Sequence, residues 1–190
     1  ERFCRIFLKI FIALIFFVNI FTSIQADEKQ SIIDHILQIN NFTFNFEQIT
    51  NEKIETGYCI LVFDNKLKCS YADKLQKEII INNRTLAVLQ KRYDKIYFYP
   101  VSKSPFINIL NKDKLINLIR NSDLILNDNI ELIYLDKNKK KIRVFFKKKS
   151  YELIGWSIKD EFQNEIYFSL KIEKINSQID KKIFRIPVMN

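Results

Sequence analysis

From residue 42 onward the chain alternates between short strand-like segments and turns, which restricts it to a mainly antiparallel β fold. Phe42, Phe44 and Phe46 alternate with polar residues, so the first segment has one apolar face. The other predicted strands are residues 58–63, 67–71, 78–81, 85–90, 95–101, 130–135, 142–146, 151–159, 165–172 and 184–188. Since no internal repeat or flexible linker divides the segments, they predict a single domain.

Two regions have helical rather than strand periodicity. Residues 30–39 predict one short amphipathic helix, with His35 on its surface and four apolar residues on its buried face: Ile32, Ile33, Ile36 and Leu37. In the middle of the chain, Ser104-Pro105 is typical of a helix start and predicts a helix through Leu110. Asp113 opens a second candidate helix, so a helical insertion interrupts the strands.

The first 26 residues have the layout of a secretory signal peptide. A basic start with Arg2, Arg5 and Lys9 precedes an apolar run over residues 10–18, and Ala26 marks a cut site. The run is shorter than the ~20 residues of a spanning helix. Cys4 precedes the run, so it is not placed to be the acylated cysteine of a lipoprotein. We therefore expect residues 1–26 to be removed on export, leaving residues 27–190 as the mature domain.

Charge and composition narrow the classes of partner. The net charge is +9, which suits nucleic acid, an anionic membrane or an acidic protein. Export makes nucleic acid the least favoured of these. Abundant Lys, Ile, Asn and Phe also fit an AT-rich genome. The lysines of residues 137–141 and 147–149 are interpreted first as solvated turn residues and second as a docking patch.

The residues that usually carry enzyme chemistry are scarce. The only glycines are Gly57 and Gly155, which leaves no phosphate-binding glycine loop, and His35 has no zinc-ligand or catalytic partner motif. The sequence therefore predicts a protein without enzymatic activity, metal or cofactor.

The first hairpin determines the expected state of the two mature cysteines. With residues 64–66 as the loop, Cys59 faces Tyr71 and Leu61 faces Cys69. The two sulfurs then lie diagonally, ~7 Å or more apart, whereas a disulfide needs directly opposed residues. We expect two free, buried thiols.

Some strands are apolar on both faces, which an ordinary half-exposed antiparallel strand is not. Residues 58–63 and 144–146 are apolar without alternation. One face could pack against a helix while the other lines a cavity for an acyl chain. The pattern fits an ordinary sandwich core equally well.

The order of these segments resembles the LolA family of periplasmic outer-membrane lipoprotein carriers. The resemblance covers roughly residues 42–188. It rests on residues 42–48 (FTFNFEQ), 57–61 (GYCIL), 99–100 (YP), 104–110 (SPFINIL), 156–170, 179–180 (ID) and 184–187 (FRIP). Each motif is degenerate, but their order and spacing are specific in combination.

The resemblance implies an incomplete antiparallel β-barrel, a half-barrel whose helical lid covers a hydrophobic cavity. The expected cavity-lining residues are Phe44, Phe46, Cys59, Leu61, Phe63, Leu67, Cys69 and Tyr71. The expected lid residues are Pro105, Phe106, Ile109 and Leu110. The family often has Arg-Pro at the first hairpin turn, with the arginine bonded to the lid, whereas this chain has Phe63 and Asp64 there.

The resemblance also implies a function. A monomeric periplasmic carrier would bind the acyl chains of lipoproteins released by an inner-membrane ABC transporter. It would deliver them to the outer membrane, by way of a lipoprotein receptor where one exists. Two alternatives remain on the same fold: a carrier of another lipid, and a non-enzymatic regulatory module that binds a peptide or a membrane protein.

Overall fold

The computed structural model describes residues 27–63, 65–103, 107–136, 139–159 and 164–187. The expected signal peptide lies outside these residues. Eleven strands make up most of the described chain: β1 (Asn41–Thr50), β2 (Lys53–Val62), β3 (Lys66–Tyr71), β4 (Lys77–Asn82), β5 (Thr85–Gln90), β6 (Lys95–Pro100), β7 (Asp123–Leu126), β8 (Asn129–Leu135), β9 (Lys141–Lys147), β10 (Leu153–Lys159) and β11 (Glu165–Ile175).

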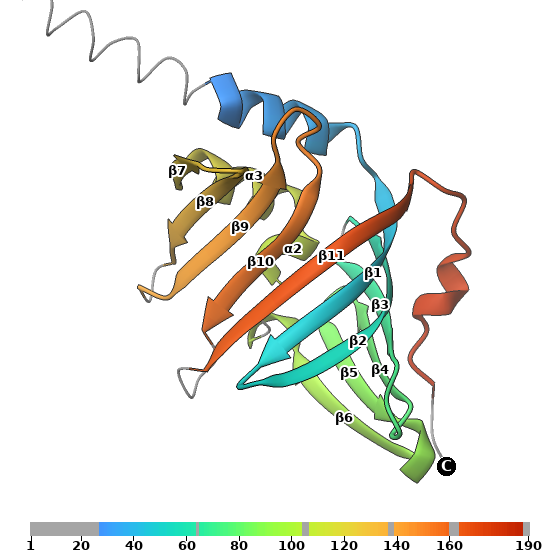
Figure 1. The fold of residues 1–190 in the computed structure, drawn as a ribbon. Coiled ribbons are helices and arrows are strands. Elements are labelled where there is room, and N and C mark those ends of the chain that lie inside the picture. The colour runs from blue at the N-terminus through green and yellow to red at the C-terminus, as the bar shows by residue number, and fades with distance from the viewer. Residues whose placement is uncertain (1–26, 64, 104–106, 137–138, 160–163, 188–190) are drawn as a thin grey trace, which may run out of the picture.

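All eleven strands form one antiparallel sheet, in the order β6-β5-β4-β3-β2-β1-β11-β10-β9-β8-β7. The long strands β1 and β11 pair at its centre (Figure 1). β6 and β7 form the two ends and do not pair with each other, so the sheet is strongly curved but open. This confirms the expected half-barrel. Within the described part of the chain, no helix has the length and apolar character needed to cross a membrane.

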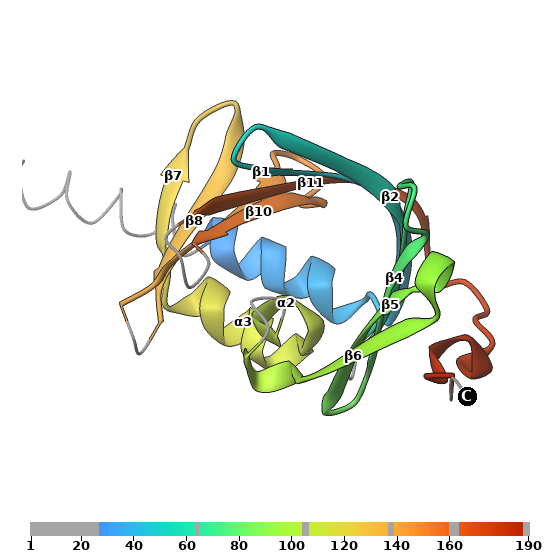
Figure 2. The same ribbon diagram turned by 90° about the horizontal axis from the view of Figure 1, so that it is seen from below.

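Three helices lie inside the curve of the sheet (Figure 2). They are the N-terminal helix of residues 27–37, α2 (Ile107–Leu110) and α3 (Lys112–Arg120). The apolar face of α3 is buried through Leu115, Ile116, Leu118 and Ile119. The N-terminal helix buries Ile32, Ile33 and Ile36 as predicted. Leu37 is instead 52% exposed, because the helix ends there and Ile39 takes the inward position.

The outer face of the sheet is covered only in part. The last described segment contains η3 (Lys181–Phe184), which packs against β3 and β4 on their outer side (Figure 2). Ile186 beyond it contacts a small apolar cluster of Ile80, Ala87 and Leu89. The neighbouring Ile79, Ile81 and Val88 face the main core. Both faces of β4 and β5 are therefore apolar because both are covered.

One strand prediction was wrong, and one strand was missed. Residues 184–188 were expected to form a strand, but the structure has η3 followed by irregular chain to residue 187. Asp180 caps η3 by accepting a hydrogen bond from the Lys182 amide, and Phe184 is fully buried. β7 was not predicted, since Leu124 is its one buried residue and a single residue gives no period-two pattern.

Candidate functional site

The inner face of the sheet and α2 enclose a small apolar space at the centre of the half-barrel. It is lined by eight side chains: Phe44, Leu61, Leu67, Cys69, Ile109, Leu110, Trp156 and Phe168. The void between them is about 10 Å³, which is roughly the room of one water molecule. The expected cavity is therefore filled by the protein's own side chains in this closed form.

Stacked aromatic rings occupy the sheet side of this space. Trp156 on β10 stacks on Phe168 of β11, with ring centroids 4.3 Å apart, and Phe168 also stacks on Phe46 at 4.9 Å. Phe44 meets the edge of Phe168 at 6.3 Å. These rings come from three adjacent strands, because every second residue of each strand faces inward.

The predicted lining residues divide into two groups. Phe44, Leu61, Leu67 and Cys69 border the void. The other four are buried in the same core but do not border it: Phe46, Cys59, Phe63 and Tyr71. Sequence reasoning missed Trp156 and Phe168 as lining residues. The alternation of Trp156 with Ile158 and of Phe168 with Leu170 is the signal that places them on the inner face.

The described part of the expected lid is α2. Ile109 and Leu110 are 2% and 1% exposed and point into the void, whereas Pro105 and Phe106 lie outside the described residues. α3 follows directly, and its N-cap Asn111 accepts a hydrogen bond from the Lys114 amide. The two helices therefore form one helical unit, which we call the α2–α3 unit (residues 107–120).

This unit is attached to the first hairpin turn. The Asn65 amide donates to the Leu110 carbonyl at 3.4 Å. The Lys112 ammonium lies 5.2 Å from the centre of the Phe63 ring and donates to the Leu37 carbonyl at 3.3 Å. One lysine thus joins the hairpin turn, the α2–α3 unit and the end of the N-terminal helix, and the ring of Phe63 accepts a cation at the position where the family often has arginine.

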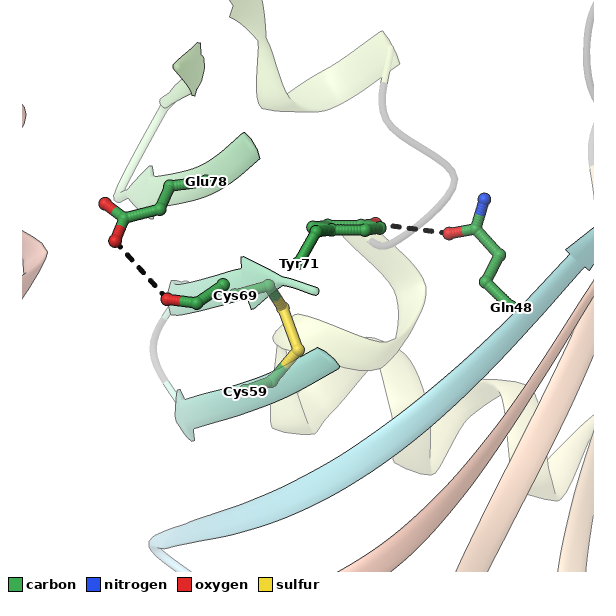
Figure 3. The surroundings of a disulfide bond; sticks show 6 residues. Gln48, Cys59, Cys69, Tyr71 and Glu78 are labelled. Carbon is green, nitrogen blue, oxygen red and sulfur yellow. Dashed lines mark hydrogen bonds between the residues drawn. A yellow bond between two sulfur atoms is a disulfide. The ribbon is translucent and has the colours of Figure 1, made fainter. Parts of the chain in front are cut away.

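The cysteine prediction was wrong: Cys59 and Cys69 form a disulfide (Figure 3). The hairpin loop also has three residues, but it is residues 63–65, one position earlier than expected. Asn65 takes the left-handed angle that closes such a loop, with φ of 64°. Leu61 then faces Leu67 and Cys59 faces Cys69, with Cα atoms 4.1 Å apart.

The hairpin between β4 and β5 also differs from expectation, but its loop lies one position later in the chain. The Asn82-Asn83 dipeptide between the predicted strands 78–81 and 85–90 suits a tight hairpin turn, but Asn82 pairs with Thr85 and the loop is Asn83–Arg84. Asn83 has a φ of 56°, the left-handed angle for which asparagine is suited. In both hairpins an asparagine residue therefore takes the left-handed position, while the exact register is decided by pairing along the strands.

At one end of the inner face of the sheet, the side chains are polar or charged rather than apolar. Tyr71 donates from its hydroxyl to Gln48 at 3.2 Å, and the Lys77 ammonium lies 3.7 Å above the Tyr71 ring (Figure 3 shows the Tyr71–Gln48 bond). Lys77 also bonds Glu55 at 2.6 Å and Lys53 bonds it at 3.1 Å. The three charged residues border a groove of about 470 Å³.

The charges in this groove shift two pKa values. Burial acts to raise the pKa of the Glu55 carboxyl, but hydrogen bonds and positive charge from Lys77 and Lys53 outweigh it, and that pKa is lowered. Burial, together with the negative charges of Glu55 and Asp73, raises the pKa of the Tyr71 phenol. Both groups therefore keep their ordinary ionisation at neutral pH.

The described residues offer no alternative chemical centre. Among them, no group of three or more His, Cys, Asp or Glu side chains could hold a metal ion. His35 is half-buried on the N-terminal helix. The eight side chains around the void could bind an apolar ligand if the α2–α3 unit moved away from the sheet.

Comparisons with known proteins agree with this geometry. The family model described as "Outer membrane lipoprotein carrier protein LolA" matches residues 37–187. The outer-membrane lipoprotein carrier protein of Campylobacter jejuni is 26% identical over 160 residues, covering 78% of this chain and 82% of that protein.

Solved structures share the fold at low sequence identity. An uncharacterized conserved protein from Thermus thermophilus superimposes with a TM-score of 0.52 at 9% identity, covering 83% of this chain and 93% of that one. MucB also gives a TM-score of 0.52, at 10% identity, covering 86% of this chain but 64% of MucB.

Proposed function

The chain belongs to the LolA family of outer-membrane lipoprotein carrier proteins, and from this premise we propose that it carries lipoproteins through the periplasm. In this proposal the α2–α3 unit opens, and the acyl chains of one lipoprotein occupy the space between α2 and the sheet. The observation that carries the proposal is the apolar interior closed by a short helical unit rather than by a paired strand.

The energetics favour acyl chains as the cargo. Each methylene group moved from water into this interior contributes ~0.8 kcal/mol. The void of about 10 Å³ cannot admit an acyl chain, so binding must displace Ile109 and Leu110. The cost of that displacement is subtracted from the affinity, which keeps release possible.

The route of the cargo follows from the family. We propose loading from an inner-membrane ABC transporter that releases lipoproteins, and delivery to the outer membrane or to a lipoprotein receptor there. The Cys59–Cys69 disulfide supports a periplasmic location, because disulfides persist in oxidising compartments.

The single tryptophan provides a direct test of binding. Trp156 borders the void, so its fluorescence should change when acyl chains displace α2. The exported protein is titrated with a synthetic triacylated lipopeptide, and the same peptide without acyl chains serves as the ligand control. Saturable change with the lipopeptide alone is expected.

A pair of variants locates the binding site. Leu67→Glu places a charge beside the void and should abolish the fluorescence response, whereas Leu135→Glu, at a position 60% exposed, should leave it unchanged. Circular dichroism checks that both variants fold. A folded Leu67→Glu variant that still binds lipopeptide would contradict the proposed site.

Transport is tested in the cell. Depletion of the protein should cause lipoproteins to accumulate at the inner membrane, as measured by fractionation of the two membranes. An unchanged distribution after depletion would contradict the carrier function even if acyl binding were observed in the test tube.

A second candidate is a non-enzymatic module that binds a protein partner on the same fold. The filled interior favours it, because such a module needs no room for lipid. The lipopeptide titration separates the two: a partner-binding module gives no saturable Trp156 response to acyl chains. Native mass spectrometry of the exported protein distinguishes bound lipoprotein from another bound lipid.

A further inference from the structure

One end of the sheet exposes a row of aromatic side chains. Strand β6 is the last strand on its side, and Tyr97, Phe98 and Tyr99 on it are 42%, 61% and 50% exposed. Tyr93 in η1 (Lys91–Tyr93), directly before β6, is 55% exposed. We call this set, together with Lys91, Arg92 and Lys95, the β6 edge patch.

The aromatic rings of β6 project from both faces of the sheet at its edge. Tyr97 pairs with Val88 and Tyr99 with Leu86, whose side chains contact the main core, so both tyrosines are on the inner face. Phe98 pairs with Ala87, which belongs to the outer cluster, so its ring is on the outer face. The patch is therefore a projecting rim and not a concave binding site.

The charge beside these rings is positive. Lys91, Arg92 and Lys95 are all exposed, and Asp94 is exposed among them. Lys91 forms an ion pair with Glu78 at 2.6 Å, so the basic charge left beside the rings comes from Arg92 and Lys95. The opposite end of the sheet is different: β7 exposes Ile125 and Leu126, which are aliphatic and lie among acidic Asp123 and Asp128. Aromatic and basic side chains thus coincide at one edge of the sheet and not at the other.

We propose that the β6 edge patch docks the protein on an anionic phospholipid surface. Tyrosine is suited to the level of the lipid headgroups, where its ring is in apolar surroundings and its hydroxyl stays hydrated. Lysine and arginine are attracted to anionic lipid. Insertion is shallow, because the unpaired backbone of an edge strand cannot enter the hydrocarbon.

Lipid fits this rim better than a second copy of the chain or an acidic protein. Two β6 edges paired with each other would bring their basic residues together. A protein partner would need a groove shaped to rings that project from both faces of the sheet, whereas a fluid membrane adapts to them. This inference goes beyond the proposed function, since it concerns an outer edge and not the acyl space.

Vesicle flotation tests the proposal with matched variants. Protein purified after export is mixed with vesicles of phosphatidylglycerol and phosphatidylethanolamine, or of phosphatidylcholine alone. Binding is expected to the anionic vesicles and to weaken with added salt. The double variant Tyr97→Ser/Phe98→Ser should lower the partition coefficient at least ~5-fold, whereas Ile125→Ser/Leu126→Ser at the other edge should not change it.

Four results of these experiments would overturn the proposal that the β6 edge patch docks on anionic lipid. Equal loss in both double variants, equal binding to both vesicle types, or no binding to anionic vesicles would exclude this docking surface. A change of oligomeric state in the β6 variant, seen by analytical ultracentrifugation, would assign the patch to self-association. The Trp156 fluorescence response to lipopeptide should persist in the β6 variant. A failure of membrane docking can therefore be distinguished from a failure of the carrier function.

Discussion

Cys59 and Cys69 join β2 and β3 beside the apolar space, with both side chains buried. The bond closes a loop of sequence separation 10 within a hairpin, so it stabilises mainly by restricting the unfolded chain. It also fixes the register in which Leu61 and Leu67 face each other beneath α2. The disulfide therefore holds β2 and β3 together on the sheet side of the apolar space.

We expect Cys59→Ala/Cys69→Ala to lower the free energy of unfolding by roughly 3 kcal/mol. The physical reason is the lost restriction of the unfolded chain, and the measurement is urea denaturation with and without reductant. Reductant should destabilise the wild-type protein by a similar amount and leave the double variant unchanged. Alkylation of either cysteine in the denatured, unreduced protein would contradict the disulfide.

Glu55 gives a pH dependence at the residue scale. Its pKa is lowered in the folded protein from the ordinary value of 4.5, so its contribution is present above that value and is lost as the pH falls through the folded-state pKa. Glu55→Gln should therefore cost on the order of 1 kcal/mol at neutral pH and progressively less below pH ~4. Urea denaturation at several pH values measures it.

The control for this pH series is Glu47→Gln, which changes an exposed glutamate on β1. Its unfolding free energy should follow that of the wild-type protein at every pH. A difference between the wild type and Glu55→Gln that stays constant as the solution is acidified would show that the carboxylate charge is not the cause.

At the scale of elements, the α2–α3 unit is the part of the interior that no strand pairing holds. Besides apolar packing, it is joined to the first hairpin and the N-terminal helix by hydrogen bonds from the Asn65 amide to the Leu110 carbonyl, from Lys112 to the Leu37 carbonyl and from Lys29 to the Arg120 carbonyl, and by the contact of Lys112 with the Phe63 ring. Contacts of this kind are each worth about 1 kcal/mol. If the unit opens as proposed, the loss of Lys112 should shift the equilibrium toward the open form.

We expect Lys112→Ala to favour opening of the α2–α3 unit. Loss of the cation–π contact and the hydrogen bond should raise amide exchange in α3 severalfold, measured by hydrogen–deuterium exchange with mass spectrometry. Lipopeptide should also bind more tightly, because less free energy is needed for opening. Lys114→Ala, an exposed lysine on the same helix, is the control and should change neither quantity.

At the scale of the whole molecule, one curved open sheet surrounds three helices (Figure 2). Pairing between neighbouring strands holds the sheet together, whereas the helices are held by side-chain packing and a few hydrogen bonds. The central strands β1 and β11 pair over nine residue pairs from Phe42 to Thr50, so the sheet resists deformation. The void between α2 and the inner face of the sheet is only about 10 Å³. Under the proposed function, acyl chains would have to displace α2, since this void is too small to hold them.

We expect lipopeptide binding to leave the strands protected and expose the helices. Amide exchange in α2 and α3 should increase on binding while exchange in β1 and β11 stays constant, as followed by hydrogen–deuterium exchange. Unacylated peptide is the control and should leave both unchanged. Increased protection of α2 on binding would instead mean that cargo is covered by a unit that never leaves the sheet.

The sequence by itself determined ten of the eleven strands and the helical insertion, but it missed β7 and predicted a strand at 184–188 that the structure does not have. Alternation at Phe42, Phe44 and Phe46 is a local signal, because the direction of a side chain in a strand depends on its near neighbours. This signal placed Phe44 and Phe46 in the core, while the family resemblance supplied the other six expected lining residues, which are also buried.

Only the tertiary structure decided the register, the disulfide and the filled interior. A shift of the first hairpin loop by one residue makes Cys59 face Cys69 rather than Tyr71, and the loop sequence allows both positions. Whether Ile109 and Leu110 fill the space before Trp156 depends on packing between segments distant in the chain. Periodicity specifies which side of a strand faces inward, but it carries no information on what occupies the space opposite.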